Sequence, residues 1–205
     1  TRTSVRLQIN GDTMRSVNVL GLFGNNAGSG VMQICLSHGY GMDRQERCQN
    51  SLRAVEGLLN CPEIELYMEV PLDAISTLND LLGGVTVTLE DDFTSADPAM
   101  TKGATLTLTG EQAVTLVRRR MDVADGTNET RMTRQREFMD AAVPLIREKI
   151  NESSGFITTM IDTLTPYVTT NMVRGRMINE INRAYHYEVE PVQYLSGEHS
   201  IGEDG

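Results

Sequence analysis

Residues 104–117 read ATLTLTGEQAVTLV, in which a strand pattern passes directly into a helix pattern. Apolar and polar residues alternate over residues 104–108, as in a half-buried strand. Thr109 and Gln112 then stand at the spacing of a capping box, whose two side chains satisfy backbone N–H groups at the start of a helix. Apolar residues at helical spacing follow as far as Val117. A strand and a capped helix therefore succeed one another without a linker.

The same succession of strands and helices extends in both directions from this stretch. We expect strands at residues 5–9, 63–70, 85–89, 104–108 and 187–195, and helices at 30–38, 43–59, 71–82, 109–117, 130–151, 155–165 and 172–185. Loops are expected at 21–30, 91–103 and 121–129, and a Gly- and acid-rich tail at 196–205. Because no repeat or linker interrupts residues 1–205, they indicate a single α/β/α layered domain with a central mixed sheet.

The chain is acidic, with a formal net charge of -10 over 205 residues. Nucleic acids require a basic surface, so this charge argues against a nucleic-acid partner. The 18 Lys and Arg residues are unevenly placed, since seven arginines lie between Arg118 and Arg147. No apolar run reaches the length of about 18 residues that a membrane span needs, so we expect none in this sequence. The concentration of arginine in one segment indicates a local role for those side chains.

The three cysteines, Cys35, Cys48 and Cys61, do not have the spacing of a metal site, and their odd number leaves at least one unpaired. Cys48 falls on a helical stripe, where a cysteine packs as a small apolar side chain. A bridge between Cys35 and Cys48 is an alternative that the sequence leaves open. His38 also lies on an apolar helix face, which favours a packed histidine over a catalytic one.

A first basic group, Arg118, Arg119 and Arg120, follows directly on the helix that begins at Thr109. If these three residues are extended, side chains two positions apart project to the same side. Arg118 and Arg120 would then point together, and Arg119 would face away.

A second basic group lies at the start of the helix predicted over 130–151. The apolar stripe of that helix consists of Phe138, Ala141, Ala142, Leu145 and Ile146. Traced back by three and four positions, the stripe reaches Arg131, Arg134 and Gln135. Free backbone N–H groups and the helix dipole at this end also attract anions, and arginine binds phosphate oxygens in pairs. The two groups predict a phosphate site; the alternative is solvated ion pairing with Asp122, Asp125, Glu129 and Glu137.

Several blocks of this sequence, taken in order, resemble the signature of the LytR-CpsA-Psr family. Residues 108–120, LTGEQAVTLVRRR, are similar to the family's leucine, NGEQAL and VRxR, and residues 131–135, RMTRQ, match its RxxRQ. Upstream, YMEV at 67–70 and LNDLLGGVTV at 78–87 resemble its YxxV and LxDxxGGVxV, and HGYG at 38–41 resembles its AYxYG segment. The resemblance extends from about Ser4 to Ile150, and the ordered set is more specific than any one block.

The resemblance implies an α/β/α domain at the extracellular face of the cytoplasmic membrane, in the cell wall, held by an N-terminal anchor outside this sequence. Such proteins are phosphotransferases that move teichoic acid, capsule or similar glycopolymers from a polyprenyl-pyrophosphate carrier to peptidoglycan. In them an apolar tunnel takes the lipid, acidic residues hold Mg²⁺ or Mn²⁺, and arginines hold the pyrophosphate. Carried over by motif, the pyrophosphate-binding residues are Arg118, Arg120, Arg131, Arg134 and Gln135, with Arg118 and Arg120 as catalytic residues. Charge neutralisation and positioning are what the splitting of a phosphoanhydride requires.

The sequence departs from the family at INGDT, residues 9–13, which resembles the family's IPRDT motif. Gly11 stands where a pyrophosphate-binding arginine is expected, and Arg15 could replace that arginine only after rearrangement. The family's metal-binding aspartates lie on preceding N-terminal strands, which we expect to be missing from these residues. The candidate metal ligands that remain, with ion pairing to the arginines as the alternative, are Asp12, Asp122 and Asp125.

These departures leave three functions open. The first is the glycopolymer phosphotransferase, the second a lipid-pyrophosphate-binding module whose catalysis is impaired by Gly11, and the third a polyprenyl-pyrophosphate pyrophosphatase with water as acceptor. A transcriptional regulator is disfavoured, because the chain is acidic and has no basic recognition helix. A sheet without its first strands would expose an edge, so we also expect a homodimer through that edge.

Overall fold

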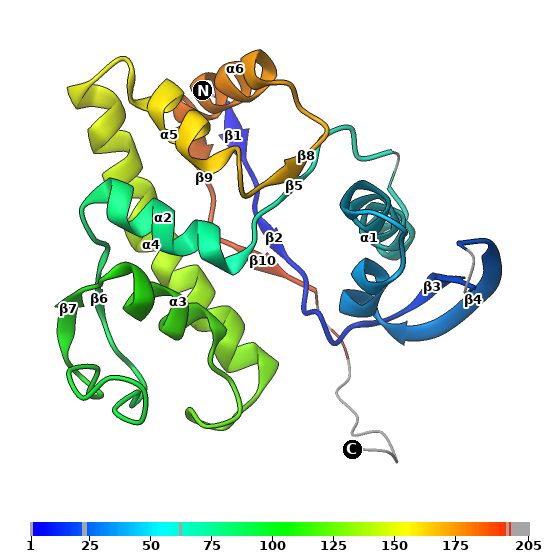
Figure 1. Ribbon diagram of the computed structural model, residues 1–205, viewed down its shortest axis with the longest axis horizontal. Helices are drawn as coiled ribbons and strands as arrows, with labels where there is room; N and C mark the ends of the chain where they lie inside the picture. The colour runs from blue at the N-terminus through cyan, green and yellow to red at the C-terminus, as the bar shows by residue number, and fades with distance from the viewer. Residues whose placement is uncertain (1, 22–23, 62, 196, 198–205) are drawn as a thin grey trace.

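The computed structural model describes residues 2–21, 24–61, 63–195 and 197 (Figure 1). Its helices are α1 (Arg44–Leu59), α2 (Leu72–Leu82), α3 (Gly110–Arg118), α4 (Asn128–Glu152), α5 (Phe156–Leu164) and α6 (Arg174–Tyr185), with a 3-10 helix, η1, at Ile34–Gly39. Its strands are β1 (Thr3–Ser4), β2 (Leu7–Gln8), β3 (Met14–Leu20), β4 (Asn26–Gln33), β5 (Met68–Glu69), β6 (Thr86–Thr88), β7 (Thr105–Thr107), β8 (Thr169–Thr170), β9 (Glu188–Val189) and β10 (Gln193–Tyr194). The tail expected at 196–205 lies outside the described residues, except for Gly197.

The largest core lies between α2, α3, α4 and the β6–β7 pair. Val85, Val87 and Leu89 are buried in it whereas Thr86 and Thr88 are exposed, as the alternation along a strand predicts. On the exposed face, threonine hydroxyls of the two strands form two cross-strand hydrogen bonds of 2.8 Å. This core supports α3 and α4, the two helices that carry the arginine motifs.

The helices begin and end where local sequence signals place them, within two residues of prediction for all six α-helices. The capping box is confirmed: Oγ1 of Thr109 accepts from the N–H of Gln112, and Oε1 of Gln112 accepts from the N–H of Thr109. Gly83 ends α2 in the left-handed conformation, with φ of 83°. The buried amide of Asn79 accepts from the N–H of Val85 (2.9 Å), which joins α2 to the strand that follows.

A β-hairpin lies where a loop was expected at 21–30. β3 and β4 pair antiparallel, with Met14 opposite Gln33. Residues 26–33 contain few apolar side chains, so their sequence gave no strand signal; they pair because β3 packs against α1 through the buried Val17 and Ala54. The helix expected at 30–38 is wrong over its first residues and begins only at Ile34, as η1.

The predicted α/β fold is confirmed, and both parallel and antiparallel strand pairs occur. The expected central sheet, however, consists in the described residues of five two-stranded pairs: β1–β9, β2–β10, β3–β4, β5–β8 and β6–β7. The strands expected at 5–9, 63–70 and 187–195 shorten to two-residue pieces. Val5 and Leu7 are 58% and 40% exposed, so no packed layer covers this strand region and extends the sheet.

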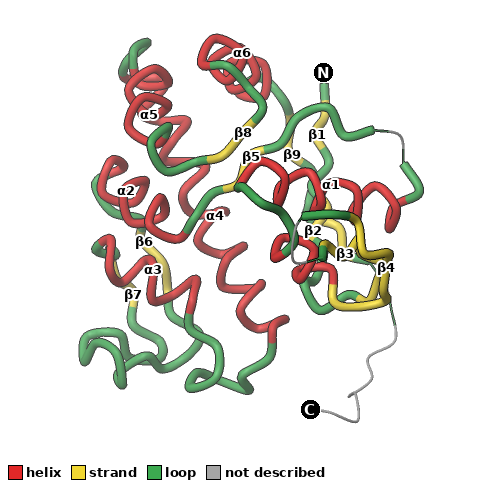
Figure 2. Tube along the Cα trace, turned by 45° about the vertical axis from the view of Figure 1, so that its right-hand side comes forward, coloured by secondary structure: helices red, strands yellow, loops and turns green. Residues whose placement is uncertain are grey.

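β1 and β2 run along α4 and carry the following residues to its N-terminal half. Arg6 forms an ion pair with Asp140 at 2.7 Å, and the side chain of Gln8 donates to the carbonyl of Met132 at 3.2 Å. Figures 1 and 2 show β2 and β10 between α4 and the group formed by α1, β3 and β4. Residues 9–13 thereby reach the start of α4.

Candidate functional site

Arg120 and Asp12 come together although they belong to separate motifs. α3 ends at Arg118, so Arg120 lies in the loop that leads to α4. Nε of Arg120 donates to the carbonyl of Gly126 (2.9 Å), which fixes the side chain against its own loop. Nη2 of Arg120 lies 3.9 Å from Oδ2 of Asp12, and the two side chains are 40% and 35% exposed. A guanidinium and a carboxylate therefore share one open site.

Asn128, the first residue of α4, joins the segment that contains Asp12 to Arg131. Asn128 is only 4% exposed. Its Nδ2 donates to Oδ1 of Asn10 (2.6 Å), and the same oxygen accepts from the N–H of Asp12 (2.9 Å). Oδ1 of Asn128 accepts from Nη2 of Arg131 (2.5 Å). Nε of Arg131 is shielded from solvent and has no hydrogen-bond partner within the described ranges.

The side chain of Cys35 lies beside Gly11, the position where the resemblance to the family leads us to expect an arginine. The N–H of Cys35 donates to the carbonyl of Gly11 at 3.0 Å. A Cβ added at residue 11 would meet Cβ of Cys35 at 3.2 Å and Nδ2 of Asn128 at 3.7 Å. All three cysteines are free, so the Cys35–Cys48 bridge does not form, and Cys48 is buried as predicted.

The charges of this region act together on the Cys35 thiol. Burial, followed by the negative charge of Asp12, raises the pKa of Cys35 above its ordinary 9.0, whereas the charges of Arg131 and Arg120 act to lower it. One thiol therefore lies within the electrostatic reach of all three charged groups. We define the arginine cluster as Asn10, Gly11, Asp12, Cys35, Arg120, Asn128 and Arg131.

The arginine cluster has the properties of an anion site. It carries two guanidiniums and one carboxylate, and it lies at the start of α4, a helix of 25 residues. The first N–H groups of a helix lack intrahelical partners, and the helix dipole adds partial positive charge there. Because Oγ1 of Thr127 already accepts from the N–H of Thr130 (3.2 Å), a phosphate or pyrophosphate could bind here chiefly through the two arginines.

The remaining residues of the VRRR motif do not all join this cluster. Arg118 is exposed at the last turn of α3, and its side chain makes no hydrogen bond or ion pair within the described residues. Arg119 forms an ion pair with Asp122 and donates to Ser95 at 2.9 Å. Because Arg118 is still helical, the extended arrangement expected for residues 118–120 begins only at Arg119.

Arg134 and Gln135 contact the protein itself. Arg134 is 2% exposed and pairs with Asp91 at 2.9 Å. It also donates to the carbonyl of Arg119, and Gln135 donates to the carbonyl of Val117 at 3.1 Å. Of the five residues assigned to pyrophosphate by motif, the structure brings Arg120 and Arg131 to one site and uses Arg134 and Gln135 to hold the end of α3.

The three candidate metal ligands are not gathered. Asp12 faces Arg120, and Asp122 pairs with Arg119, as the ion-pair alternative predicted. Asp125 accepts from the N–H of Thr127 and from two threonine hydroxyls, and these hydrogen bonds lower its pKa to about 2. No group of three or more His, Cys, Asp or Glu residues that could hold a metal occurs in the described part of the chain. These residues therefore do not fit a self-contained metal site.

An apolar cavity opens beside the arginine cluster. Its volume is about 340 Å³, and it is lined by Ile9, Ile34, Cys35, Ser37, His38, Ser51 and Val55. Cys35 belongs to both the cavity and the cluster, so the two are continuous. His38 is not packed as predicted: its side chain is 40% exposed, and its ring nitrogens lie 3.4 Å from Ser51 and 3.6 Å from Glu69.

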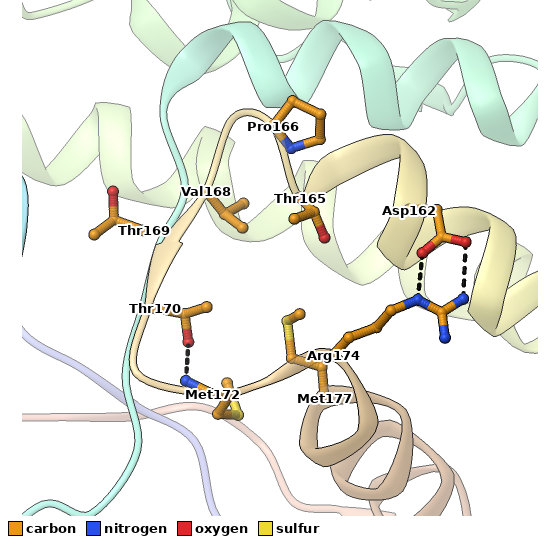
Figure 3. Close-up of a pocket in the computed structure, with 9 residues that line it drawn as sticks. All are labelled: Asp162, Thr165, Pro166, Val168, Thr169, Thr170, Met172, Arg174 and Met177. Carbon is orange, nitrogen blue, oxygen red and sulfur yellow. Dashed lines mark hydrogen bonds and ion pairs between the residues drawn. The ribbon is translucent and has the colours of Figure 1, made fainter.

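A second cavity, of about 500 Å³, lies between α5, β8 and α6 (Figure 3). Asp162 and Arg174 form a two-point ion pair at its edge, with distances of 2.6 and 2.8 Å. α5 follows the C-terminal end of α4, whereas the arginine cluster lies at the other end of that 25-residue helix, about 35 Å away along its axis. The two sites are therefore separate.

The profile of the LytR_cpsA_psr family matches residues 41–199. The chain belongs to the LytR_cpsA_psr family. Within the arginine cluster, Arg120, Asn128 and Arg131 lie in the matched residues, whereas Asn10, Gly11, Asp12 and Cys35 precede them. No helix in the described ranges is both long and apolar enough to cross a membrane.

Other members of the LytR_cpsA_psr family resemble this chain in sequence and fold. A Bacillus mycoides protein named polyisoprenyl-teichoic acid–peptidoglycan teichoic acid transferase TagU is 31% identical over 132 residues, which span 63% of this chain and only 41% of that protein. The crystal structure of protein gbs0355 from Streptococcus agalactiae is 20% identical with a TM-score of 0.75, covering 96% of this chain and 66% of that one. Bacillus subtilis TagU is 20% identical with a TM-score of 0.57, over 91% and 69%. The structural likenesses confirm the fold.

Sequence reasoning missed Asn10, Cys35 and Asn128 as parts of the site. Asn128 stands three positions before Arg131, a spacing that places two helical side chains side by side, so it could have been found. Asn10 and Cys35 reach the site through the pairing of β2 with β10 and the position of η1. Their sequence carries no signal for either.

Proposed function

We propose that this chain is part of a transferase that moves a cell-wall glycopolymer from a polyprenyl-pyrophosphate carrier to peptidoglycan, at the extracellular face of the membrane. The observation that carries the proposal is the meeting of Arg120 and Arg131, from the two arginine motifs, at the N-terminus of α4. There the arginine cluster would bind the pyrophosphate. Arg118, exposed at the end of α3, would reach the same ligand from the side.

The named relatives support this choice of substrate. The Bacillus mycoides relative is named polyisoprenyl-teichoic acid–peptidoglycan teichoic acid transferase TagU. A TagT structure described as bound to LI-WTA is 20% identical to this chain, with a TM-score of 0.65 over 91% of it. Because the chain spans less than two thirds of these proteins, the activity of the whole protein is part of the proposal.

The chemistry of the site suits this reaction. Cleavage of a phosphoanhydride places negative charge on the departing phosphate, and two fixed guanidiniums stabilise that charge without rearrangement. The apolar cavity beside Cys35 would take the first isoprene units of the carrier, which bind by burial of hydrocarbon. We assign no step to Mg²⁺ or Mn²⁺, because the aspartates of the described residues do not form a site for one.

Calorimetric titration with farnesyl pyrophosphate tests the proposal, with and without Mg²⁺. The parent chain should bind, and Arg120→Ala with Arg131→Ala should weaken binding about 100-fold, since each hydrogen bond to a charged group contributes about 1.5–3 kcal/mol. The matched control is Arg176→Ala, which removes an arginine from the exposed Arg176–Glu180 pair on α6 and should leave binding unchanged. Equal affinities of parent and double variant would rule the arginine cluster out.

Gly11 favours a second candidate, a module that binds lipid pyrophosphate without transferring the glycopolymer. A site that lacks one arginine has less charge with which to stabilise the departing phosphate. Incubation of the full-length protein with a polyprenyl-pyrophosphate glycan separates the alternatives. Glycan joined to peptidoglycan supports the transferase, released phosphate supports a pyrophosphatase, and binding without product supports the module.

A further inference from the structure

The second arginine motif holds the backbone of the first. The last carbonyls of an α-helix have no intrahelical partner. At the end of α3, the carbonyl of Val117 accepts from Nε2 of Gln135 (3.1 Å), and the carbonyl of Arg119 accepts from Nη2 of Arg134. These two carbonyls flank Arg118, and the peptide that begins with the second one leads directly into Arg120. The backbone that presents both arginines is therefore anchored on α4.

Asp91 fixes the guanidinium that makes one of these anchors. Oδ2 of Asp91 lies 2.9 Å from Nη1 of Arg134, and the two side chains are 16% and 3% exposed. The guanidinium carbon also lies 5.4 Å from the ring centroid of the buried Phe93. A guanidinium is rigid and planar. The carboxylate of Asp91 at Nη1 and the Phe93 ring against the guanidinium face therefore determine the direction of Nη2, which donates to the Arg119 carbonyl.

We propose that Asp91 is a positioning residue for the pyrophosphate site. Acting through Arg134, it holds the segment Val117–Arg120 in the conformation that presents Arg118 and Arg120. Arg134 itself, although it belongs to the RxxRQ motif, has its guanidinium committed inside the protein and touches no substrate. That the ligand is a pyrophosphate rests on the proposed function. The anchoring of the Val117–Arg120 backbone by Arg134 does not depend on it.

Two substitutions separate positioning from general stability. Asp91→Asn keeps the size of the side chain and removes the charge that orients the guanidinium. Arg134→Lys keeps a cation that can pair with Asp91, but it lacks the Nη2 group that donates to the Arg119 carbonyl. Asp92→Asn is the matched control, because Asp92 is the neighbouring carboxylate, is exposed, and accepts only from Thr94.

The first measurement is hydrogen exchange by mass spectrometry, which needs no ligand. Asp91→Asn and Arg134→Lys should each speed exchange of the amides at 118–121 by about tenfold, with exchange in α5 and α6 unchanged and with Asp92→Asn behaving as the parent. The second measurement is the affinity for inorganic pyrophosphate. Asp91→Asn should weaken it by about tenfold, and its loss combined with Arg120→Ala should be smaller than the product of the two single losses, since both act on one contact.

The proposal is overturned by exchange at 118–121 that matches the parent, or by losses of affinity that multiply independently. A parent chain that binds no pyrophosphate, with exchange still accelerated in Asp91→Asn, would instead overturn the proposed function and leave the anchoring of the segment established. The two failures are therefore distinguishable.

Discussion

The side chain of Cys35 occupies the space into which a side chain at Gly11 would extend, with Cβ of Cys35 only 3.2 Å from a Cβ added there. Gly11 is the position where the family's arginine is expected. Cys35 thus fills the space that a side chain at residue 11 would need. A side chain at residue 11 therefore requires Cβ of Cys35 to move by a few tenths of an ångström or to be removed.

We therefore predict that Gly11→Arg with Cys35→Gly, which removes the contacting Cβ, binds farnesyl pyrophosphate about 10- to 100-fold more tightly than the parent. One added hydrogen bond between an arginine and a phosphate contributes about 1.5–3 kcal/mol. Gly11→Arg alone should gain less and lose about 1–3 kcal/mol of stability from overpacking. Calorimetry and urea denaturation measure the two effects. Gly175→Arg adds the same charge on α6, where no atom lies within 4 Å; it should leave binding unchanged and, because it replaces a glycine inside a helix, raise stability by about 0.5–1 kcal/mol. A double variant that binds as the parent does would contradict the prediction.

Asn128→Ala should destabilise the chain and weaken pyrophosphate binding together. The variant removes the amide that bonds Asn10 and Arg131, and it leaves buried polar atoms without partners, at a cost of about 1–3 kcal/mol. Urea denaturation and calorimetry measure the two losses. Asn182→Ala, which removes an exposed amide bonded only to the Ile178 carbonyl, is the control and should have little effect on either. Unchanged affinity in Asn128→Ala would show that Arg131 does not need the hydrogen bond to Asn128 in order to bind pyrophosphate.

Asp125→Asn should lower stability at pH 7 and have a vanishing effect in acid. Hydrogen bonds from Thr127 and Thr130 hold the pKa of Asp125 at about 2 in the folded chain, below its ordinary 3.8. A depressed pKa means that the carboxylate stabilises the fold above pH 4, and that this contribution disappears as the pH falls towards 2. The difference between the urea midpoints of parent and variant should be full at pH 7, narrow below pH 4, and be smallest at pH 2 or below. Glu148→Gln removes an exposed charge from α4 as the control, and a difference that does not narrow between pH 4 and pH 2 would contradict the assignment.

The Cys35 thiol should react slowly with iodoacetamide at pH 7.5, although the residue is exposed. Burial and the charge of Asp12 raise its pKa, and only the thiolate reacts. Asp12→Asn removes the second of these causes and should speed alkylation by about two- to fivefold. Pyrophosphate, which adds negative charge beside the thiol, should slow it. Peptide mass spectrometry follows both rates, with Cys61 as the internal reference, and slower alkylation of Cys35 in Asp12→Asn would contradict the electrostatic account.

The features of this protein that follow from its sequence alone are local. The capping box at Thr109, the glycine stop at Gly83 and the apolar stripes fixed six α-helices, because caps and helical periodicity depend on residues within a few positions of one another. The ordered motifs determined the family and drew attention to the arginines. Caps, helical periodicity and ordered motifs can be recognised in the sequence without knowledge of which distant segments are in contact.

The partners of these residues, in contrast, depend on the tertiary fold. β4 forms because β3 lies beside it, and Asn10 and Cys35 enter the site because strand pairing and η1 bring them to α4. Arg131 and Arg134 stand one helical turn apart in the same motif, yet Arg131 is half-buried and donates to Asn128, whereas Arg134 is buried against Asp91. The reason is physical: spacing along a helix selects a face, but the distant side chains that pack on that face decide whether a charge meets solvent, a ligand or a buried counter-ion.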